Sequence, residues 1–585
     1  MRAEPLPPLA RFSLACVALL CSLPFLQPYH LYPLTSFYTE WLAFGLGIGV
    51  ATVLLQRRIW EQVEVPWAVL SPFALAALLM VHGALGWSPY FGHALLGALY
   101  LIWAGILIVA TRTLVHTCGT DTVFSVVAVG FVVGASLSAM IGIIQHFNLM
   151  TPFNAFIVRL NGPSIFGNLA QPNHFGAYTA LGLFSIAYLY GRGRMVLASA
   201  AVCALPLLFV LGLSGSRSVW LYLFTAFGFA AWLRGASSKD EEGRRLFIAC
   251  GALIIIYFVL QLMVDAGWFK PIGREAVTSV ERLFSGAQSV SDRVGLWGAA
   301  WSMAMDHPVL GVGWGAFSSQ YFDLISAADT NAPLGIFNNA HNILLHLFAE
   351  TGVIGVVLLL IPLMFWLADA WRAERDARQW WLFATIGVLA IHSMLEYPLW
   401  YAYFLGIAAV LLGLAPTRGF MPQLARLGRL FAVTVLCISA ANLVFIWTDY
   451  REYERLVHGS PDQMRGVDVN ETMKRLHRNF LLTPYLELTS VVVLPVAEKN
   501  LSLRLTLNER VIRFTPQPLF VYRQVLLLAL AERLPEAQEL LARLQHAYPD
   551  VPPEFERELA QGLREHPDRF RPLLESVSRR AGARN

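Results

Sequence analysis

About thirteen long apolar stretches constrain this chain more than any other feature of its sequence. A membrane hydrocarbon core about 30 Å thick requires about 20 apolar residues per helix. The stretches lie near residues 9–26, 38–55, 66–83, 91–110, 122–144, 175–190, 195–213, 218–233, 246–264, 342–369, 380–395, 398–415 and 430–447. Only 14% of the 585 residues are charged, whereas soluble proteins carry roughly 25%. The sequence therefore predicts an all-α polytopic membrane protein with about 12–13 transmembrane helices.

The distribution of arginine among the connecting loops predicts the orientation in the membrane. Cytoplasmic loops accumulate Lys and Arg, and with the N-terminus inside, every second loop is rich in arginine. Arg159 and Arg217 are the exceptions on the other side. An odd number of helices then places residues 448–585 outside. We expect a multi-pass inner-membrane protein whose functional face lies on the outer side of that membrane.

Two regions lie outside the apolar stretches. One is a large loop, residues 265–341, and the other is the polar C-terminal part, residues 448–585. Within the latter, Leu519–Glu532 and Glu536–Ala547 show helical apolar spacing and resemble one tetratricopeptide-like hairpin. We therefore expect a transmembrane domain over residues 1–447, with 265–341 as its periplasmic loop, and a C-terminal helical region over 448–585. The chain has no basic tract and no nucleic-acid-binding motif, so we expect no nucleic-acid partner.

A glycine- and proline-containing outer loop, residues 161–176, holds the first group of polar candidates. These are Asn168, Gln171, Asn173 and His174. Amide and imidazole side chains supply hydrogen-bond donors and acceptors for a substrate. The alternative interpretation is a turn-rich connection with no further role.

Two arginines on the outer side form the second group. Arg217 stands alone between two apolar stretches, and a guanidinium binds phosphate in a fixed bidentate geometry. Arg293 precedes Trp297 at helical spacing, and Trp314 lies in the glycine-rich segment Gly311–Gly315. The alternatives are snorkelling of arginine toward lipid phosphate and interfacial anchoring by tryptophan.

The third group lies at the outer ends of later apolar stretches. His341 and Asn342 precede the tenth stretch, where an imidazole can accept a proton near neutral pH. Capping of the helix by Asn342 is the alternative. Glu396 and Tyr397 follow the eleventh stretch, and Glu396 comes four residues after His392. Tyrosine is also common at membrane boundaries for structural reasons.

These groups together could hold a diphosphate and orient or deprotonate a hydroxyl. Arginines can stabilise a leaving diphosphate electrostatically. The outer segments contain no paired carboxylates of the kind that hold Mg²⁺ or Mn²⁺. We therefore expect no metal site, no cofactor and a metal-independent reaction.

Several segments resemble the bacterial protein O-oligosaccharyltransferases, the pilin-glycosylating group within the O-antigen ligase and polymerase superfamily. They are Gly167–Gly176, Ser214–Ser218, His307–Trp314, Ala340–Glu350 and His392–Tyr401. The His-Asn and arginine segments are typical of the whole superfamily. The segment His392–Tyr401 is typical of the protein-glycosylating group and favours that group.

The resemblance implies an all-α membrane glycosyltransferase with a GT-C-type fold. Such an enzyme transfers a preassembled oligosaccharide en bloc from undecaprenyl diphosphate to Ser or Thr hydroxyls of a periplasmic protein or pilin. The essential histidine of the superfamily falls on His341 and its arginines on Arg217 and Arg293, while Glu396 would hold His341 or the acceptor. The partners implied are the lipid-linked glycan, the acceptor protein and membrane lipid. The expected substrate-binding residues are Asn168, Gln171, Asn173, His174, Asn342, Tyr397 and Trp314.

Two other functions are open at this point. An O-antigen ligase or polymerase belongs to the same superfamily, but such proteins commonly lack a long C-terminal helical region. A transporter of lipid-linked glycan would show internal repeats and polar groups near the bilayer midplane. The polar groups here lie at the outer edge and no repeat is visible, which favours an enzyme.

Overall fold

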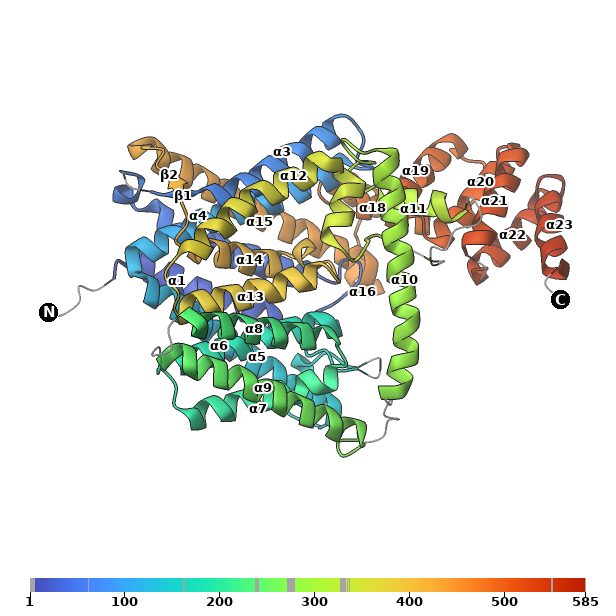
Figure 1. The fold of residues 1–585 in the computed structure, drawn as a ribbon. Coiled ribbons are helices and arrows are strands. Elements are labelled where there is room, and N and C mark those ends of the chain that lie inside the picture. The colour runs from blue at the N-terminus through green and yellow to red at the C-terminus, as the bar shows by residue number, and fades with distance from the viewer. Residues whose placement is uncertain are drawn as a thin grey trace. The chain divides into compact units, whose positions relative to one another are not determined.

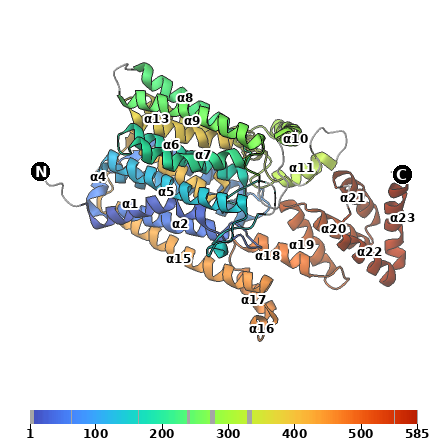
Figure 2. The ribbon, with the colours of Figure 1, turned by 90° about the horizontal axis from the view of Figure 1, so that it is seen from below.

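The computed structural model is built almost entirely from α-helices (Figures 1 and 2). It describes residues 6–583 except 62, 161, 163, 237–240, 271–278, 327–332, 334, 336 and 549–550. Asn161 and Pro163, and parts of the predicted loop 265–341, therefore lie outside the described residues. The only two strands among the described residues, β1 (Val65–Pro66) and β2 (Gly419–Phe420), form one short antiparallel ribbon.

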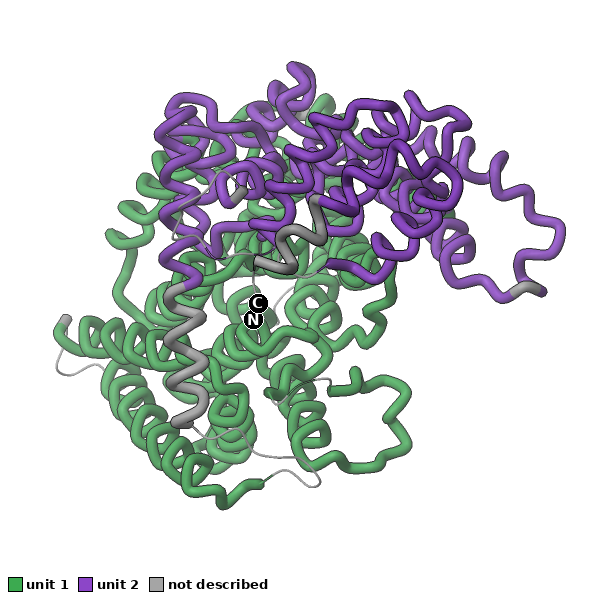
Figure 3. The backbone as a smooth tube through the Cα atoms, turned by 90° about the vertical axis from the view of Figure 1, so that its right-hand side faces the viewer, with its two compact units in different colours: residues 1–74, 100–287, 358–448 green, residues 75–99, 288–357, 449–585 purple. Residues whose placement is uncertain are grey.

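The chain divides into two compact units, coloured separately in Figure 3. Unit 1 comprises residues 1–74, 100–287 and 358–448, and unit 2 comprises residues 75–99, 288–357 and 449–585. The unit boundary at residue 448 lies beside the predicted domain boundary, but unit 2 also contains two earlier segments. The functional domains expected from the sequence therefore stay a prediction.

Every predicted apolar stretch forms a helix. These helices are α1 (Pro8–Leu20), α2 (Phe37–Ala51), α3 (Leu70–Ala84), α4 (Phe91–Cys118), α5 (Thr120–Phe147), α6 (Pro172–Gly191), α7 (Leu197–Ser214), α8 (Ser218–Ala236), α9 (Glu241–Asp265), α12 (Ile343–Arg372), α13 (Ala377–Ser393), α14 (Ala402–Leu414) and α15 (Ala425–His458). Nine helical segments of the described residues are long and apolar enough to cross a membrane. The remaining four helices are α6, α8, α13 and α14. The prediction of an all-α polytopic membrane protein is confirmed.

Helix α6 lies at the centre of unit 1. It contacts α5, α7, α8, α9 and α13, and nearly all of its residues are buried. Because a helix enclosed by others presents little surface to lipid, α6 does not need the high hydropathy of a lipid-facing span.

Connections that the sequence places in the cytoplasm meet at one end of unit 1. Arg192, after α6, pairs with Asp121 of α5 at 3.1 Å and with Glu242 of α9 at 2.8 Å. Arg378, at the start of α13, pairs with the same Asp121 at 3.4 Å. Loops joined by ion pairs must lie on one side of the bundle, as the alternation of arginines requires. Which side of the membrane this is stays a prediction.

Unit 2 contains the C-terminal helices, of which α19–α23 share one hydrophobic core with α10 and α11. Besides α10 (Ser279–Asp306) and α11 (Phe317–Ser326), they are α16 (Pro461–Met464), α17 (Val469–Leu476), α18 (Thr483–Val493), α19 (Leu501–Phe514), α20 (Pro518–Leu530), α21 (Leu534–Ala547), α22 (Pro553–Glu565) and α23 (Pro567–Ala583). Leu296 of α10, Phe317 of α11 and Leu526 of α20 belong to the same core. Helices α20 and α21 confirm the predicted helical pair; Pro549 lies outside the described residues.

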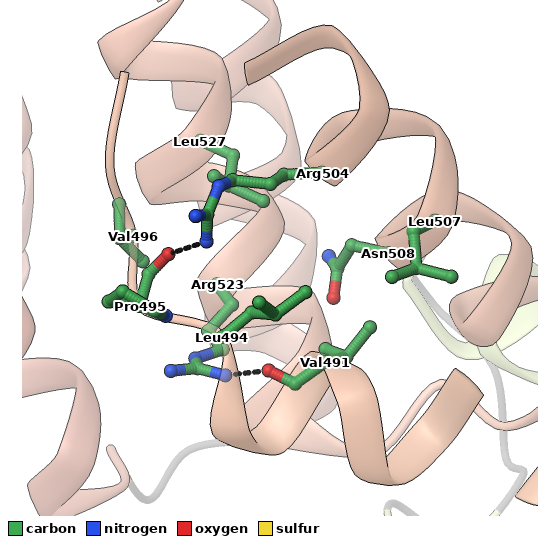
Figure 4. Close-up of a pocket in the computed structure, with 9 residues that line it drawn as sticks. All are labelled: Val491, Leu494, Pro495, Val496, Arg504, Leu507, Asn508, Arg523 and Leu527. Atoms are coloured by element: carbon green, nitrogen blue, oxygen red, sulfur yellow. Dashed lines mark hydrogen bonds between the residues drawn. The ribbon is translucent and has the colours of Figure 1, made fainter. Parts of the chain in front are cut away.

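A small cavity lies between α18, α19 and α20 (Figure 4). Its volume is about 20 Å³, which is room for about one water molecule. Arg504 and Arg523 point toward it, and their guanidinium groups donate to the carbonyl oxygens of Pro495 and Val491. Arg504 of α19 therefore joins the segment that follows α18, and Arg523 of α20 joins α18 itself. The cavity is a structural junction of the C-terminal region.

Candidate active site

A buried polar cluster lies at the start of α6 in unit 1. Asn173 Nδ2 donates a hydrogen bond of 2.7 Å to Glu396 Oε1. His174 Nδ1 and His392 Nε2 lie 3.1 Å apart. Glu396 is only 4% exposed, and a buried carboxylate requires such partners because burying an unpaired charge is costly. Two segments far apart in the sequence are therefore fixed to each other by side chains that were singled out from the sequence.

Amide side chains hold the loop that leads into α6. Gln171 is the N-cap residue of this helix: its Oε1 accepts a 2.5 Å hydrogen bond from the backbone N–H of His174, and Pro172 follows at the first position. The side chain of Asn168, 2% exposed, bonds to three backbone groups of neighbouring segments at 2.8–3.1 Å. Asn168 thus uses its amide to shape the loop.

Gln145 of α5 holds the same loop and was not anticipated from the sequence. Its Oε1 accepts from the N–H of Gly167 at 2.9 Å, and its Nε2 donates to the carbonyl oxygen of Gly167 at 2.6 Å. The side chain is buried and lies on α5, one residue beyond the predicted apolar stretch 122–144. A polar residue in that position is itself a signal, because such residues in membrane helices are usually retained for a function or a partner.

Arg217 lies in the short connection between α7 and α8. It is exposed, and within the described part of the chain its guanidinium has no hydrogen bond or ion pair. The connection is fixed beneath it, because the hydroxyl groups of Ser216 and Ser218 are hydrogen-bonded at 2.8 Å and both residues are buried. A guanidinium on a fixed backbone is available to an anionic ligand.

Two tyrosines flank the short 3₁₀ turn η6 (Pro398–Trp400) that follows the buried cluster. The rings of Tyr397 and Tyr401 stack with centroids 6.0 Å apart, and His174 lies edge-on to both. Burial, and to a smaller degree the Glu396 carboxylate, raises the pKa of Tyr397 above its ordinary value of 10.0, against the lowering effect of its hydrogen bond with Tyr401. At neutral pH the Tyr397 hydroxyl is therefore protonated and can donate.

His341 lies in unit 2, just before α12. Its φ of 51° falls in the left-handed region that residues other than glycine seldom adopt. The backbone N–H of His341 donates to Asn339 Oδ1 at 2.8 Å, and Asn339 is 4% exposed. The imidazole is half-buried. The backbone around this histidine is thus held in an uncommon conformation by a buried neighbour, a feature that often marks functional positions.

Asn342 caps α12. Its Oδ1 accepts hydrogen bonds from the backbone N–H groups of Leu344 and Leu345 at 3.1 and 3.2 Å. This is the capping role that was the alternative interpretation of the sequence. The residue is 5% exposed, and substrate binding by Asn342 stays a prediction.

A break in α12 receives the glycine-rich segment that precedes α11. Gly352 has φ 65° and ψ −168°, so the helix is interrupted there. The N–H of Val353 donates to Pro308 O at 2.8 Å, and the N–H of Gly313 donates to Glu350 O at 3.0 Å. Backbone groups left unpaired by the break are therefore satisfied by the inserted segment. The apolar pattern of this stretch does not indicate the interruption.

The ionisable pair inside α12 braces this part of unit 2. His346 Nε2 lies 3.5 Å from Glu350 Oε2, and Glu350 Oε1 accepts from the N–H of Phe317 at 3.1 Å. His346 Nδ1 also accepts from the N–H of Ala340 at 3.4 Å. Because Ala340 precedes His341, the pair connects the histidine loop to α11 and α12.

Trp314 and Arg293 lie in unit 2 as well. The backbone N–H of Trp314 donates to His82 Nδ1 at 3.1 Å, and its ring stacks on His93 with centroids 6.3 Å apart. The indole is thus packed within the unit. Arg293 is half-buried on α10, one turn before the core residue Leu296.

The expected site residues fall into two groups by unit. Asn168, Gln171, Asn173, His174, Arg217, Glu396 and Tyr397 lie in unit 1, and Arg293, Trp314, His341 and Asn342 lie in unit 2. Hydrogen bonds join Asn173 to Glu396 and Gln171 to His174. Within the described ranges, no three His, Cys, Asp or Glu side chains are grouped closely enough to hold a metal ion.

Two protein families match parts of the chain. The family of O-antigen ligases matches residues 200–360, and the family described as virulence factor membrane-bound polymerase, C-terminal, matches residues 380–561. The first range contains Arg217, Arg293 and His341. The second contains Glu396 and most of the C-terminal helices.

Two proteins of Acinetobacter baylyi (strain ATCC 33305 / BD413 / ADP1) are similar to the chain. A general O-oligosaccharyltransferase is 26% identical over 455 residues, covering 75% of this chain and 76% of that protein. A ComP-specific O-oligosaccharyltransferase is 25% identical over 301 residues, covering 51% and 52% respectively. A multi-pass helical architecture, the matched families and these relatives agree with one another. Together these matches support an oligosaccharyltransferase of the O-antigen ligase superfamily.

Proposed function

We propose that the protein transfers a preassembled oligosaccharide en bloc from undecaprenyl diphosphate to Ser or Thr hydroxyls of a periplasmic protein or pilin. The reaction takes place at the outer face of the bacterial inner membrane. The observation that carries the proposal is the similarity to an O-oligosaccharyltransferase over three quarters of both chains. The exposed Arg217 and the conformationally constrained His341 supply the chemistry that such a transfer requires.

The arginines neutralise the leaving diphosphate. Arg217 is exposed on a fixed connection, so its fork can pair with two phosphate oxygens. Arg293 contributes a second cation from α10. Loss of one preorganised contact to a developing charge typically lowers the rate about 10²–10³-fold. No divalent ion is needed in this scheme.

His341 orients the acceptor hydroxyl and takes its proton. A bond forms between the hydroxyl oxygen and the anomeric carbon as the bond from that carbon to the diphosphate oxygen breaks. The bonding electrons leave with undecaprenyl diphosphate, and the proton passes to the imidazole and then to solvent. General base assistance of this kind contributes about 10²–10⁴-fold.

Glu396 acts as a positioning residue in this scheme. Because it is buried and bonded to Asn173, it fixes the start of α6 and the adjacent Tyr397. The Tyr397 hydroxyl, protonated at neutral pH, is then a donor for the glycan or the diphosphate. Asn168 and Gln171 shape the same loop.

The decisive experiment combines the full chain with a lipid-linked glycan pathway and a pilin in one bacterial cell. Mass analysis of the pilin should show a mass increase equal to one complete glycan. Addition of EDTA to a membrane assay should leave the yield unchanged. An unmodified pilin would contradict the protein acceptor, and activity restored by Mg²⁺ or Mn²⁺ after chelation would contradict the metal-free reaction.

A second candidate is ligation of glycan to a lipid acceptor, which the match to the O-antigen ligase family over residues 200–360 favours. The same cells distinguish it. Glycan appearing on the lipopolysaccharide core, with the pilin unmodified, would support this function instead.

A further inference from the structure

A lateral groove in unit 1 joins a charged pair to an apolar wall. It encloses about 320 Å³. The wall consists of Trp67, Leu70, Ile361, Pro362 and Phe365. The start of α3, helix α12 and the segment that follows α14 meet at this groove. The β1–β2 ribbon pairs the segment before α3 with the segment after α14.

The charged mouth of the groove is built from Asp369 and Arg418. The backbone N–H of Arg418 donates a hydrogen bond of 3.0 Å to Asp369 Oδ2. The Nε–H of the same arginine donates a hydrogen bond of 2.9 Å to Asp369 Oδ1. The Asp369 side chain is 9% exposed and that of Arg418 is 67% exposed. The carboxylate therefore fixes the guanidinium through Nε. The two terminal nitrogens of Arg418 bond to no residue in the part of the chain that the structure describes.

The apolar wall runs from this mouth along a candidate membrane span. Asp369 and Ile361 are eight residues apart on α12, which corresponds to about 12 Å along the helix axis. Ile361 and Phe365 are 49% and 57% exposed, and Leu70 of α3 is 45% exposed. Side chains so exposed on a span face hydrocarbon, so the groove leads from the level of lipid headgroups into the acyl region.

The charge at the mouth favours an anion. Arg372, 72% exposed, lies 3.9 Å from Asp369, so two arginines surround one aspartate. Trp67 is 42% exposed with its ring 5.2 Å from that of Phe420, and tryptophan is enriched at the headgroup level. Basic side chains near the membrane surface attract anionic lipids.

We propose that this groove binds one anionic phospholipid. The headgroup phosphate pairs with the terminal nitrogens of Arg418, and one acyl chain lies against Ile361 and Phe365. Asp369 is the positioning residue that keeps the guanidinium directed at the phosphate. The groove lies at the end of unit 1 that is predicted to be cytoplasmic. The bound lipid therefore belongs to the cytoplasmic leaflet of the membrane. The proposal requires only the membrane location of the protein and is independent of glycan transfer.

The test is native mass spectrometry of the full chain purified in detergent and titrated with phosphatidylglycerol. The wild type should retain one tightly bound lipid, and Arg418→Gln should weaken that retention about tenfold, since a charge-assisted fork is lost. Phe365→Ala should also weaken lipid retention, because it removes part of the apolar wall against which the acyl chain lies. The matched control is Arg234→Gln, which removes an exposed arginine of the same predicted end that lies outside the groove, and it should retain lipid as the wild type does.

Three results would overturn the proposal. If Arg418→Gln retained phosphatidylglycerol as well as the wild type does, Arg418 would not bind the headgroup phosphate. Equal retention of phosphatidylcholine and phosphatidylglycerol would show ordinary annular lipid. Displacement of phosphatidylglycerol by an equal concentration of undecaprenyl phosphate would assign the groove to a polyprenyl lipid instead. Because lipid binding is measured directly, none of these results depends on whether the protein glycosylates a pilin.

Discussion

His341 combines an uncommon backbone conformation with a chemically competent side chain. Its φ of 51° is held by a hydrogen bond from its own N–H to Asn339. Asparagine tolerates the left-handed region better than most residues do, so a substitution can remove the imidazole without disturbing the backbone. The residue therefore offers a clean separation of chemistry from folding.

We expect His341→Asn to lower the rate of glycan transfer about 10²–10⁴-fold, because the general base is lost. The apparent Tm of the purified protein should remain close to that of the wild type. Transfer is measured by mass analysis of the pilin over a time course. His307→Asn, at an exposed position before α11, is the matched control and should be active. Substantial activity in His341→Asn would assign the base to another residue.

The roles of Arg217 and Arg293 are tested by substitutions that keep the positive charge of the side chain. Arg217→Lys and Arg293→Lys should each lower transfer about 10²–10³-fold, because an ammonium cannot form the bidentate fork to phosphate oxygens. Arg244→Lys, on an exposed arginine near the start of α9 that pairs with Glu241, should leave the rate unchanged. If both lysine variants retained wild-type rates, the arginines would be membrane anchors and the diphosphate site would lie elsewhere.

At the scale of elements, helix α12 is a candidate membrane span that is interrupted at Gly352. The segment before α11 inserts its backbone at Gly352, and a Cβ added there would lie 2.2 Å from the carbonyl carbon of Val309. Its φ of 65° with ψ of −168° is also a conformation essentially confined to glycine. Sequence periodicity cannot reveal such a break, because the apolar pattern of the helix continues through it.

Gly352→Ala should therefore lower the apparent Tm strongly, with a conformational cost of about 1–3 kcal/mol before the steric overlap is added. Transfer should fall as well, since the segment that contacts Glu350 would shift. Gly298→Ala is the control: no atom lies within 4 Å of a Cβ added at this helical position, and alanine favours helix. A Gly352→Ala protein as stable as the wild type would contradict the described insertion.

The C-terminal helices are tied to the start of α4 by a buried polar group in unit 2. Tyr90 Oη donates to Glu487 Oε2 at 2.7 Å, and Arg510 Nη2 lies 2.7 Å from Glu487 Oε1. Glu487 is 5% exposed. Since hydrogen bonds to a buried charge are worth about 1.5–3 kcal/mol, this group should contribute measurably to stability.

A double-mutant cycle tests that contribution. Tyr90→Phe and Glu487→Gln should each lower the apparent Tm, and the double variant should lower it by less than the sum of the two, because both remove the same bond. Tyr485→Phe, on the same helix as Glu487, serves as the control for removal of a tyrosine hydroxyl near the group. Strict additivity in the cycle would show that Tyr90 and Glu487 do not interact.

At the scale of the whole molecule, the arginine pattern makes a prediction about sidedness. Ion pairs among Asp121, Arg192, Glu242 and Arg378 gather the arginine-rich loops at one end of unit 1. If that end is cytoplasmic, the end of α15 lies outside. A phosphatase that is active only in the periplasm, fused after His458, should be active, and the same enzyme fused after Arg194 should be inactive. The reverse pattern would invert the topology.

The sequence by itself determined the architecture and the identity of most polar candidates. The number and length of the apolar stretches require membrane helices, since unpaired backbone groups cannot lie in hydrocarbon. Proline and glutamine at the start of α6 and asparagine at the start of α12 also follow local rules of capping. Each of these signals depends on residues that are close together in the chain, so a single sequence is enough to recognise it.

Only the tertiary structure decided which distant groups meet. The contact of Asn173 with Glu396, the clamp of Gln145 on Gly167, the insertion at Gly352 and the fixed fork of Arg418 each join segments that no periodicity relates. Such pairings depend on how helices pack, and packing is set by the complementarity of many side chains at once. The sequence shows that a polar residue in a span needs a partner, whereas the fold alone shows which partner it has.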